Sequence, residues 1–238
     1  MLQILNFLQQ LSDNNNRDWF NANKPLYQEL QARFHALAEE LIAAISSWDD
    51  DIAASNLTVK DCTYRIYRDT RFSKNKAPYK THMGIYICKG GKKAPYAGYY
   101  FHLEPEFFGP DSFNENHLSI GGCALIAGTY HFENKILRSI RDEISVNGES
   151  FVGAIKEAEG FEFFEGDMLK KVPSEFAFAP QEFHYLLKQK EFALCKFIDK
   201  EYLSSPNLAQ KVAEDFLDGI SGNALCKKNL VNILRKDI

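Results

Sequence analysis

The sequence predicts an α+β fold, a single domain in which a mainly antiparallel sheet is flanked by helices. Residues 2–48 repeat apolar side chains at three- and four-residue steps, the spacing of amphipathic helices. Residues 58–127 instead alternate apolar and polar side chains between glycine and proline turns, with connections too short for crossover helices. Helical spacing returns after residue 134, and no linker rich in Pro, Gly or Ser divides the 238 residues. One domain over 1–238 is therefore expected.

The composition is that of a globular protein, with 45% hydrophobic and 25% charged residues. No run approaches the roughly 18 apolar residues of a membrane span, and the N-terminus does not resemble a secretory signal. The five cysteines are widely spaced without a C-x-x-C pair, which is typical of reduced thiols. We therefore expect a cytoplasmic protein with no membrane partner. The six histidines form no zinc-type cluster, so no metal site is predicted, and nothing assigns a cofactor or an oligomeric state.

The first part of the chain is predicted to hold two helices. Leu2–Leu11 has helical spacing and is stopped by the turn-forming residues 13–16. A long helix then begins after Asn23, with Pro25 in its first turn, and an apolar stripe runs along it. The three aspartates 49–51 that follow are expected in a solvated loop.

The middle of the chain is predicted to form the sheet. Period-two alternation favours strands over Thr58–Arg68, residues 83–87, Tyr96–Glu104 and Leu118–Ala127. Gly121-Gly122 in the last of these suggests a bulge or a close backbone approach. The remainder is predicted to be mostly helical, over 136–144, 151–158, 205–217 and 224–235, with short strands at the sheet margin over 160–164 and 192–198.

A dense cationic stretch, residues 64–80, stands out against this background. Its six cations face one acid, Asp69, for a local charge of +5 in a chain of net charge −4, so the rest of the chain carries −9. The positive charge is therefore confined to this segment and is not a general property of the surface. The stretch also contains rigid, apolar side chains, those of Phe72, Pro78 and Tyr79, and these favour a segment that is packed against the protein. The six cations are Arg65, Arg68, Arg71, Lys74, Lys76 and Lys80.

Converging cations favour a site for an anionic small molecule, with phosphate as the preferred group. Arginine offers a planar fork that binds phosphate or carboxylate through two hydrogen bonds. Surface ion pairs contribute only about 0–1 kcal/mol each, so stability alone is a weak reason for six cations in one segment. The predicted ligand-binding residues are Arg65, Arg68, Arg71, Phe72, Lys76, Tyr79 and Lys80.

Three residues are predicted to handle protons if the site is catalytic: Asp69, His102 and Glu104. His102 and Glu104 share a predicted strand face with Tyr100 and are expected to border the cationic stretch. An imidazole titrates near neutrality and so suits acid–base chemistry. A hydrogen-bonded histidine on a half-buried strand is the alternative. No known nucleophile, P-loop, Rossmann or paired-carboxylate motif occurs, so whether the protein is an enzyme stays open.

Two other functions fit the same stretch. Cations interleaved with Tyr67, Phe72 and Tyr79 resemble a nucleic-acid-binding surface, although the negative net charge makes this the less favoured partner. The stretch can also be an internal salt network that joins the sheet to the helices. In that case each arginine should contact a carboxylate, and the available acids are Asp69, Glu104, Glu106, Asp111 and Asp167.

The motif R-x-x-R-D-x-R-F-S-x-N-K-x-P-Y-K-T, from Arg65 to Thr81, resembles the signature of domain of unknown function family 2461, a bacterial family of conserved hypothetical proteins. N-N-x-R-D-W-F from Asn14, G-Y-Y-F-H-L-E-P from Gly98 and D-M-L-K-K-V-P from Asp167 resemble its other blocks. The resemblance covers nearly the whole chain and implies a cytoplasmic-type protein without an assigned activity. Residues 121–127 depart from the glycine-rich block expected there. By resemblance the family is defined by Arg65, Arg68, Asp69, Arg71, Phe72, Lys76 and Tyr79.

Overall fold

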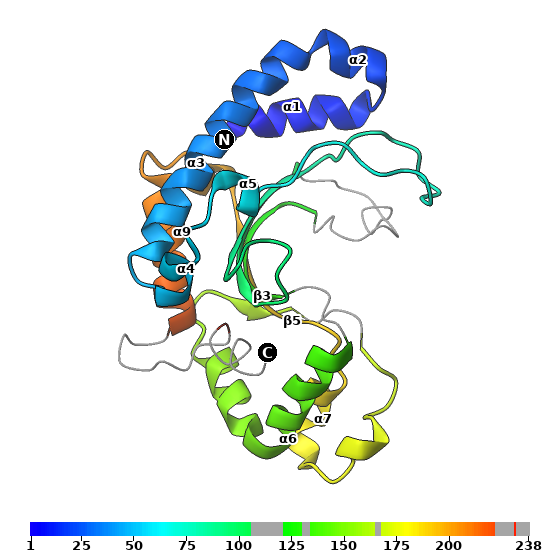
Figure 1. Cartoon of the computed structure of the whole chain (residues 1–238), viewed down its shortest axis with the longest axis vertical. Helices are drawn as coiled ribbons and strands as arrows, with labels where there is room; N and C mark the ends of the chain where they lie inside the picture. Colours follow the sequence, from blue (N-terminus) through cyan, green and yellow to red (C-terminus); the bar gives the residue numbers. More distant parts are fainter. Residues whose placement is uncertain (106–120, 130–133, 165–167, 222–230, 232–238) are drawn as a thin grey trace.

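The computed structural model of the chain describes residues 1–105, 121–129, 134–164, 168–221 and 231 (Figure 1). Its centre is an antiparallel sheet of five strands in the order β1-β2-β3-β5-β4, with helices packed around it. The predicted α+β class, a mainly antiparallel sheet flanked by helices, is confirmed. The strands are β1 (Met83–Cys88), β2 (Gly98–Leu103), β3 (Cys123–Thr129), β4 (Glu162–Phe163) and β5 (Phe192–Ile198).

Three helices build the N-terminal part, and two of them match the prediction closely. The helix α1 (Leu2–Asp13) stops at the predicted turn, and α3 (Lys24–Ser46) begins directly after Asn23. The Asn23 side chain does not cap α3, because its amide donates to the Trp19 carbonyl at 2.9 Å. Between them lies α2 (Arg17–Ala22), which is capped by the Asn16 side chain accepting from the Trp19 amide at 2.9 Å.

The prediction of a solvated loop over residues 49–51 is wrong. Asp49 is buried and begins a short helix, α4 (Asp50–Ser55). Its carboxylate accepts from the Ile52 amide at 3.1 Å and from the Tyr99 hydroxyl at 2.8 Å. Both bonds offset the cost of burying the charge, and a carboxylate suits the positive end of a helix.

The prediction of a strand over Thr58–Arg68 is also wrong. Its first half is a helical turn, α5 (Val59–Cys62), which begins at Thr58. The Asp61 carboxylate accepts from the Thr58 amide at 3.0 Å and from its hydroxyl at 2.6 Å, a local bonding pattern that favours the helix. Beyond the turn, the strand-like pairing of this segment with other described residues consists of isolated bridges, at Thr63–Ile85 and Tyr67–Tyr79.

The two faces of the sheet have different neighbours. Tyr99 and Phe101 of β2 face α3 and α9 (Leu208–Ser221), with the Phe34 ring 6.5 Å from Phe101 and the Phe216 ring 5.3 Å from Tyr99. Figure 1 shows these helices on one side of the sheet. By alternation, Tyr100 and His102 lie on the other face.

The strand β5 was predicted at the margin of the sheet, but it pairs with both β3 and β4 and is therefore internal. The strand at that margin is β4, which is two residues long, and β1 forms the opposite edge. The helices predicted over 136–144 and 151–158 lie on the two sides of a kink at Asn147 within α6 (Asn134–Lys156), where the backbone is non-helical. The helix predicted over 224–235 lies outside the described residues, apart from residue 231. The remaining elements are η1 (Ser174–Phe176), η2 (Gln181–Phe183), α7 (His184–Leu187) and α8 (Lys200–Leu203).

The four described cysteines are buried thiols, and no disulfide joins any two of them. Burial raises the pKa of the Cys62 thiol to about 12 and that of Cys195 to about 11, so both remain protonated near neutral pH. Cys226 lies outside the described residues. In the described part of the chain, no helix has the length and apolar character needed to cross a membrane.

Candidate functional site

The cationic stretch forms a two-stranded arm, residues 64–80, beside the edge strand β1. The Arg68 amide donates to the Pro78 carbonyl at 2.9 Å, and the Lys80 amide donates to the Ile66 carbonyl at 2.8 Å. These two bonds flank the Tyr67–Tyr79 bridge and close the base of the arm. The tip, residues 69–77, extends away from the sheet (Figure 1).

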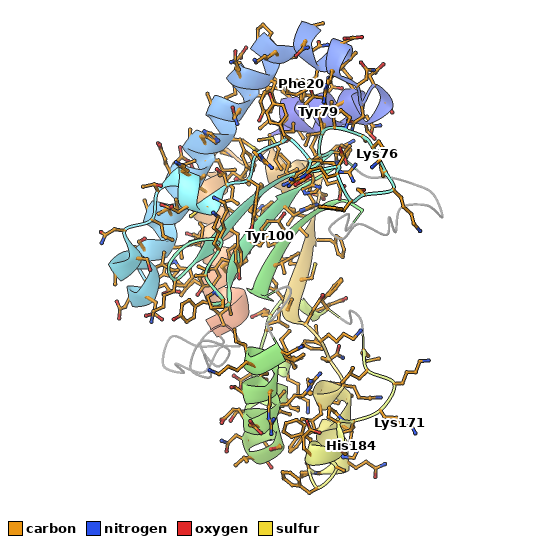
Figure 2. The ribbon with its side chains drawn as sticks, turned by 45° about the vertical axis from the view of Figure 1, so that its right-hand side comes forward. Phe20, Lys76, Tyr79, Tyr100, Lys171 and His184 are labelled. Atoms are coloured by element: carbon orange, nitrogen blue, oxygen red, sulfur yellow. The ribbon has the colours of Figure 1, made fainter. Side chains whose placement is uncertain are left out.

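Tyr79 anchors the arm to the N-terminal helices. Its ring is 4% exposed and stacks on Phe20 with 4.0 Å between centroids. The Asn15 side chain binds the Tyr79 backbone twice, donating to its carbonyl at 3.0 Å and accepting from its amide at 3.1 Å. Figure 2 shows Phe20 and Tyr79 together between these helices and the arm. Tyr79, predicted to bind ligand, therefore has a structural role and offers little surface to a ligand.

The tip of the arm holds a paired aspartate and an exposed phenylalanine. Arg71 binds Asp69 with two parallel bonds, Nε–Oδ1 at 3.0 Å and Nη2–Oδ2 at 2.7 Å. Hydrogen bonds from Arg71 lower the pKa of Asp69 to about 2, so this carboxyl has no proton to donate near neutral pH. Phe72 is 96% exposed, so the prediction that its ring packs against the protein is wrong. Lys76 Nζ donates to the Thr70 carbonyl at 3.0 Å, further out along the arm in Figure 2.

The base of the arm carries three cations, Arg65, Arg68 and Lys80. In the described part of the chain, none of the three forms an ion pair with a carboxylate. Burial lowers the pKa of Lys80, and the charges of Arg65 and Arg68 lower it further. The three groups therefore repel one another.

The Arg68 side chain is held in place by the arm itself. Its guanidinium donates to the Ala77 carbonyl at 3.0 Å and to the Ser73 hydroxyl at 3.4 Å. Because both acceptors are neutral, they orient the charge without neutralising it. The internal salt network requires a carboxylate for each arginine of the stretch, and among Arg65, Arg68 and Arg71 only Arg71 has one within ion-pair distance in the described residues. Of the other acids proposed for that network, Glu106, Asp111 and Asp167 lie outside the described residues.

Three side chains on the face of β2 away from α3 and α9 form a continuous hydrogen-bonded chain. The Tyr100 hydroxyl lies 2.9 Å from His102 Nδ1, and His102 Nε2 lies 3.1 Å from Glu104 Oε2. His102 and Glu104 are 0% and 1% exposed. His102 and Glu104, two of the three predicted proton-handling residues, are thus adjacent and buried. Tyr100 is half-buried, and its hydroxyl lies over Gly84 of β1.

His82 links this chain to the cations of the arm. Its ring lies 5.2 Å from the ring of His102. Burial lowers the pKa of His82 to about 3, assisted by the neighbouring His102 and by the charges of Lys80 and Arg68. His82 is therefore neutral at physiological pH. His82 thus contacts His102 and lies near the charges of Lys80 and Arg68, and the expectation that His102 and Glu104 border the cationic stretch stays a prediction.

Gly84 of β1 provides the space for the Tyr100 ring. It pairs with His102 in the antiparallel register, and a Cβ at this position would lie 2.3 Å from the Tyr100 hydroxyl. Neither His82 nor Gly84 was predicted as a site residue. The signal for both was their position directly after the Arg65–Thr81 motif.

A family model described as "Conserved hypothetical protein (DUF2461)" matches residues 3–110 and 116–219. The chain belongs to this family. The match includes the arm, His82, Gly84 and β2, and it confirms the resemblance inferred from the sequence. Neither a curated protein nor a solved structure matches the chain.

A pocket and two further polar side chains of this DUF2461 member suit an anion less well than the base of the arm does. A pocket of about 390 Å³ lies on another side of Glu104, between α1 and α8, and its charged residues also include Asp199 and Lys200. Two carboxylates against one ammonium make this pocket a poor site for an anion. Lys171 and His184 lie in the lower part of the molecule in Figure 2, away from the arm. No described group of three or more His, Cys, Asp or Glu residues is arranged to hold a metal ion.

The lowered pKa of His82 predicts that this DUF2461 protein loses stability in acid. Between its ordinary pKa of 6.5 and about 3, the unfolded chain binds a proton that the folded protein does not. The free energy of unfolding should therefore fall as the pH drops below 6.5, with a contribution of up to about 1.4 kcal/mol per pH unit. His82→Gln should remove that contribution, as measured by urea unfolding at several pH values. His35→Gln on α3 is the matched control, and equal pH dependence in wild type and His82→Gln would contradict the prediction.

Proposed function

We propose that this protein binds a phosphate-bearing small molecule at the base of the arm, through Arg65, Arg68 and Lys80. The observation that carries the proposal is the placement of three cations at the base of the arm, none of which pairs with a carboxylate of the described residues. Burial lowers the pKa of Lys80, and the neighbouring charges of Arg65 and Arg68 lower it further. Holding like charges close together costs free energy. A bound dianion attracts each of the three cations, and this attraction offsets their repulsion. The site is local, since the chain as a whole has a net charge of −4.

The geometry of the base also suits phosphate. Arg68 is oriented by two neutral acceptors, so less side-chain entropy is lost when it binds an anion. Lys80 Nζ lies 5.2 Å from the centroid of the Tyr64 ring, a contact that holds the ammonium without neutralising it. The Arg71 guanidinium, in contrast, is occupied by Asp69. We therefore assign binding to the base of the arm and not to its tip.

A titration with inorganic phosphate tests this proposal. Arg65→Gln and Arg68→Gln should each weaken binding about tenfold or more, because a hydrogen bond to a charged group contributes roughly 1.5–3 kcal/mol. Arg65 is exposed, so Arg65→Gln should leave the melting temperature of the unliganded protein unchanged or slightly raised by the loss of repulsion. Calorimetry measures the affinity, and thermal denaturation measures the stability.

Arg138→Gln is the matched control, since Arg138 is exposed on α6 at the other end of the molecule (Figure 1). It should not alter phosphate binding. Equal affinity in wild type and in Arg65→Gln and Arg68→Gln would contradict the proposal. Binding of single-stranded RNA with a steep salt dependence, without binding of phosphate, would instead indicate a nucleic-acid module built on the arm and its exposed Phe72.

A further inference from the structure

The pocket of about 390 Å³ beside Glu104 lies at one end of the sheet, where β2 ends, β3 begins and β5 ends. Cys123 of β3 pairs with Ile198 of β5 in the antiparallel register, and both residues line the pocket. The helix α1 forms one wall, and the turn from β5 into α8 forms another. A hollow of this volume accommodates a small molecule.

The wall formed by α1 is half apolar and half polar. It consists of Leu2, Leu5, Asn6 and Gln9, which follow the spacing i, i+3, i+4 and i+7 of a single helix face. The two leucines offer apolar surface, and the two amides offer hydrogen bonds. Gln9 Nε2 donates to Asp13 Oδ1 at 3.3 Å, so the Gln9 carbonyl oxygen remains as an acceptor.

Glu104 brings to the pocket a carboxyl oxygen that has no hydrogen-bond partner. Its Oε2 lies 3.1 Å from His102 Nε2, whereas no described residue donates to its Oε1. Although the side chain is 1% exposed, Oε1 does not belong to the described polar atoms that are closed to solvent without a partner. The pocket therefore gives access to this oxygen. A buried acceptor without a donor costs free energy, and a donor on a ligand removes that cost.

Asp199 supplies a second carboxylate to the lining. Its Oδ1 accepts from the Tyr202 amide at 2.7 Å and begins α8, while no described residue donates to its Oδ2. Lys200, the cation of the described lining, forms no ion pair with either carboxylate among the described residues. Acceptors and carboxylates thus predominate over donors and cations in this pocket.

We propose that the pocket binds a primary amine carried on an apolar chain, with its ammonium group held by Glu104 and Asp199. An ammonium has three donors and no acceptor, and the lining offers it Glu104 Oε1, Asp199 Oδ2 and the Gln9 carbonyl oxygen. The two leucines of α1 cover the apolar chain. A metal ion fits less well, because no described group of three or more His, Cys, Asp or Glu residues is arranged to hold one. The inference does not rest on the phosphate site.

A comparison of three ligands of equal length tests the inference. Calorimetry on the full chain measures the binding of hexylamine, hexan-1-ol and hexanoate. Hexylamine should bind about tenfold or more tightly than hexan-1-ol, because a hydrogen bond to a charged group is stronger than one between neutral groups. Hexanoate should bind most weakly, since the carboxylates of the pocket repel it.

Four variants separate the site from the fold. Asp199→Asn should weaken hexylamine binding about tenfold and leave the melting temperature unchanged, because asparagine caps a helix as well as aspartate does. Glu104→Gln should weaken binding similarly. Lys200→Gln should strengthen it by up to about fivefold, since an exposed charge that repels the ligand is removed. Asp142→Asn, at an exposed position on α6, is the matched control and should have no effect.

A free amine and the lysine side chain of a peptide present the same ammonium on an apolar chain. Nα-acetyl-lysine methylamide is therefore titrated in parallel. Tighter binding of this blocked lysine than of hexylamine supports the site and identifies a peptide as its source, and the reverse order supports a free amine.

Three results would overturn the inference. They are no binding of either amine, equal affinity for hexylamine and hexan-1-ol, and unchanged hexylamine affinity in both Asp199→Asn and Lys200→Gln. Phosphate affinity should be the same in Asp199→Asn as in the wild type, so the amine site and the phosphate site are judged separately.

Discussion

Tyr79→Ala is expected to lower the free energy of unfolding by about 3–5 kcal/mol, the range found when large buried aromatic side chains are truncated. The ring is 4% exposed, stacks on Phe20 and closes the base of the arm. Its loss leaves a cavity against the N-terminal helices and frees the arm from them. Urea unfolding measures the effect. Phosphate binding should weaken as well, because Arg68 and Lys80 are held by the backbone bonds on either side of Tyr79.

The matched control is Tyr79→Phe, which keeps the ring and removes only the hydroxyl. It should change the free energy of unfolding by about 1 kcal/mol or less and leave phosphate affinity intact. A Tyr79→Phe variant with normal stability and strongly reduced phosphate affinity would show that the hydroxyl binds ligand. Such a result would restore the role that the sequence suggested for Tyr79.

Gly128→Ala should lower the free energy of unfolding by about 3 kcal/mol or more. Gly128 lies in β3 with a φ of +136°, a conformation that side chains with a Cβ rarely adopt. A Cβ there would lie 2.1 Å from the backbone oxygen of Phe192 on β5. Backbone atoms of a paired strand cannot turn aside as a flexible side chain can, so the two strands must separate locally. Chemical denaturation and the yield of folded protein measure the result.

Gly153→Ala makes the same glycine-to-alanine change at an uncrowded position and is the control for Gly128→Ala. Gly153 lies within α6, and a Cβ there meets no atom within 4 Å. Alanine should stabilise the helix by roughly 0.5–1 kcal/mol. The two substitutions are thus expected to have opposite signs. Similar losses for both would indicate that the β3–β5 contact is not the cause.

The fold class followed from periodicity, because helical and strand spacing are properties of the sequence itself. The errors occurred where a specific hydrogen bond overrides the pattern. Thr58–Arg68 alternates like a strand, yet Asp61 bonds to Thr58 and begins a helical turn. Asp49 looked like a loop residue, yet its carboxylate caps α4 and binds Tyr99, fifty residues further along the chain. Contacts at that separation leave no local signal.

The candidate site was predictable in its residues and less so in its geometry. Charge density identified Arg65, Arg68 and Lys80, and alternation placed His102 and Glu104 on one face. The burial of a side chain depends on which other elements cover it, so neither charge density nor alternation showed that His102 and Glu104 are fully buried. The exposure of Phe72 was missed for the same reason.

The pairing of β3 with β5 has a consequence for the nascent chain. The 62 residues between Thr129 and Phe192 must leave the ribosome before the two strands can meet. At roughly 5–20 residues per second, this takes about 3–12 s. During that interval β3 is the outermost strand of a three-stranded intermediate, and its unpaired amides and carbonyls are open to a wrong strand. The interval between the synthesis of residues 129 and 192 is therefore the stage at which β3 is most open to mispairing.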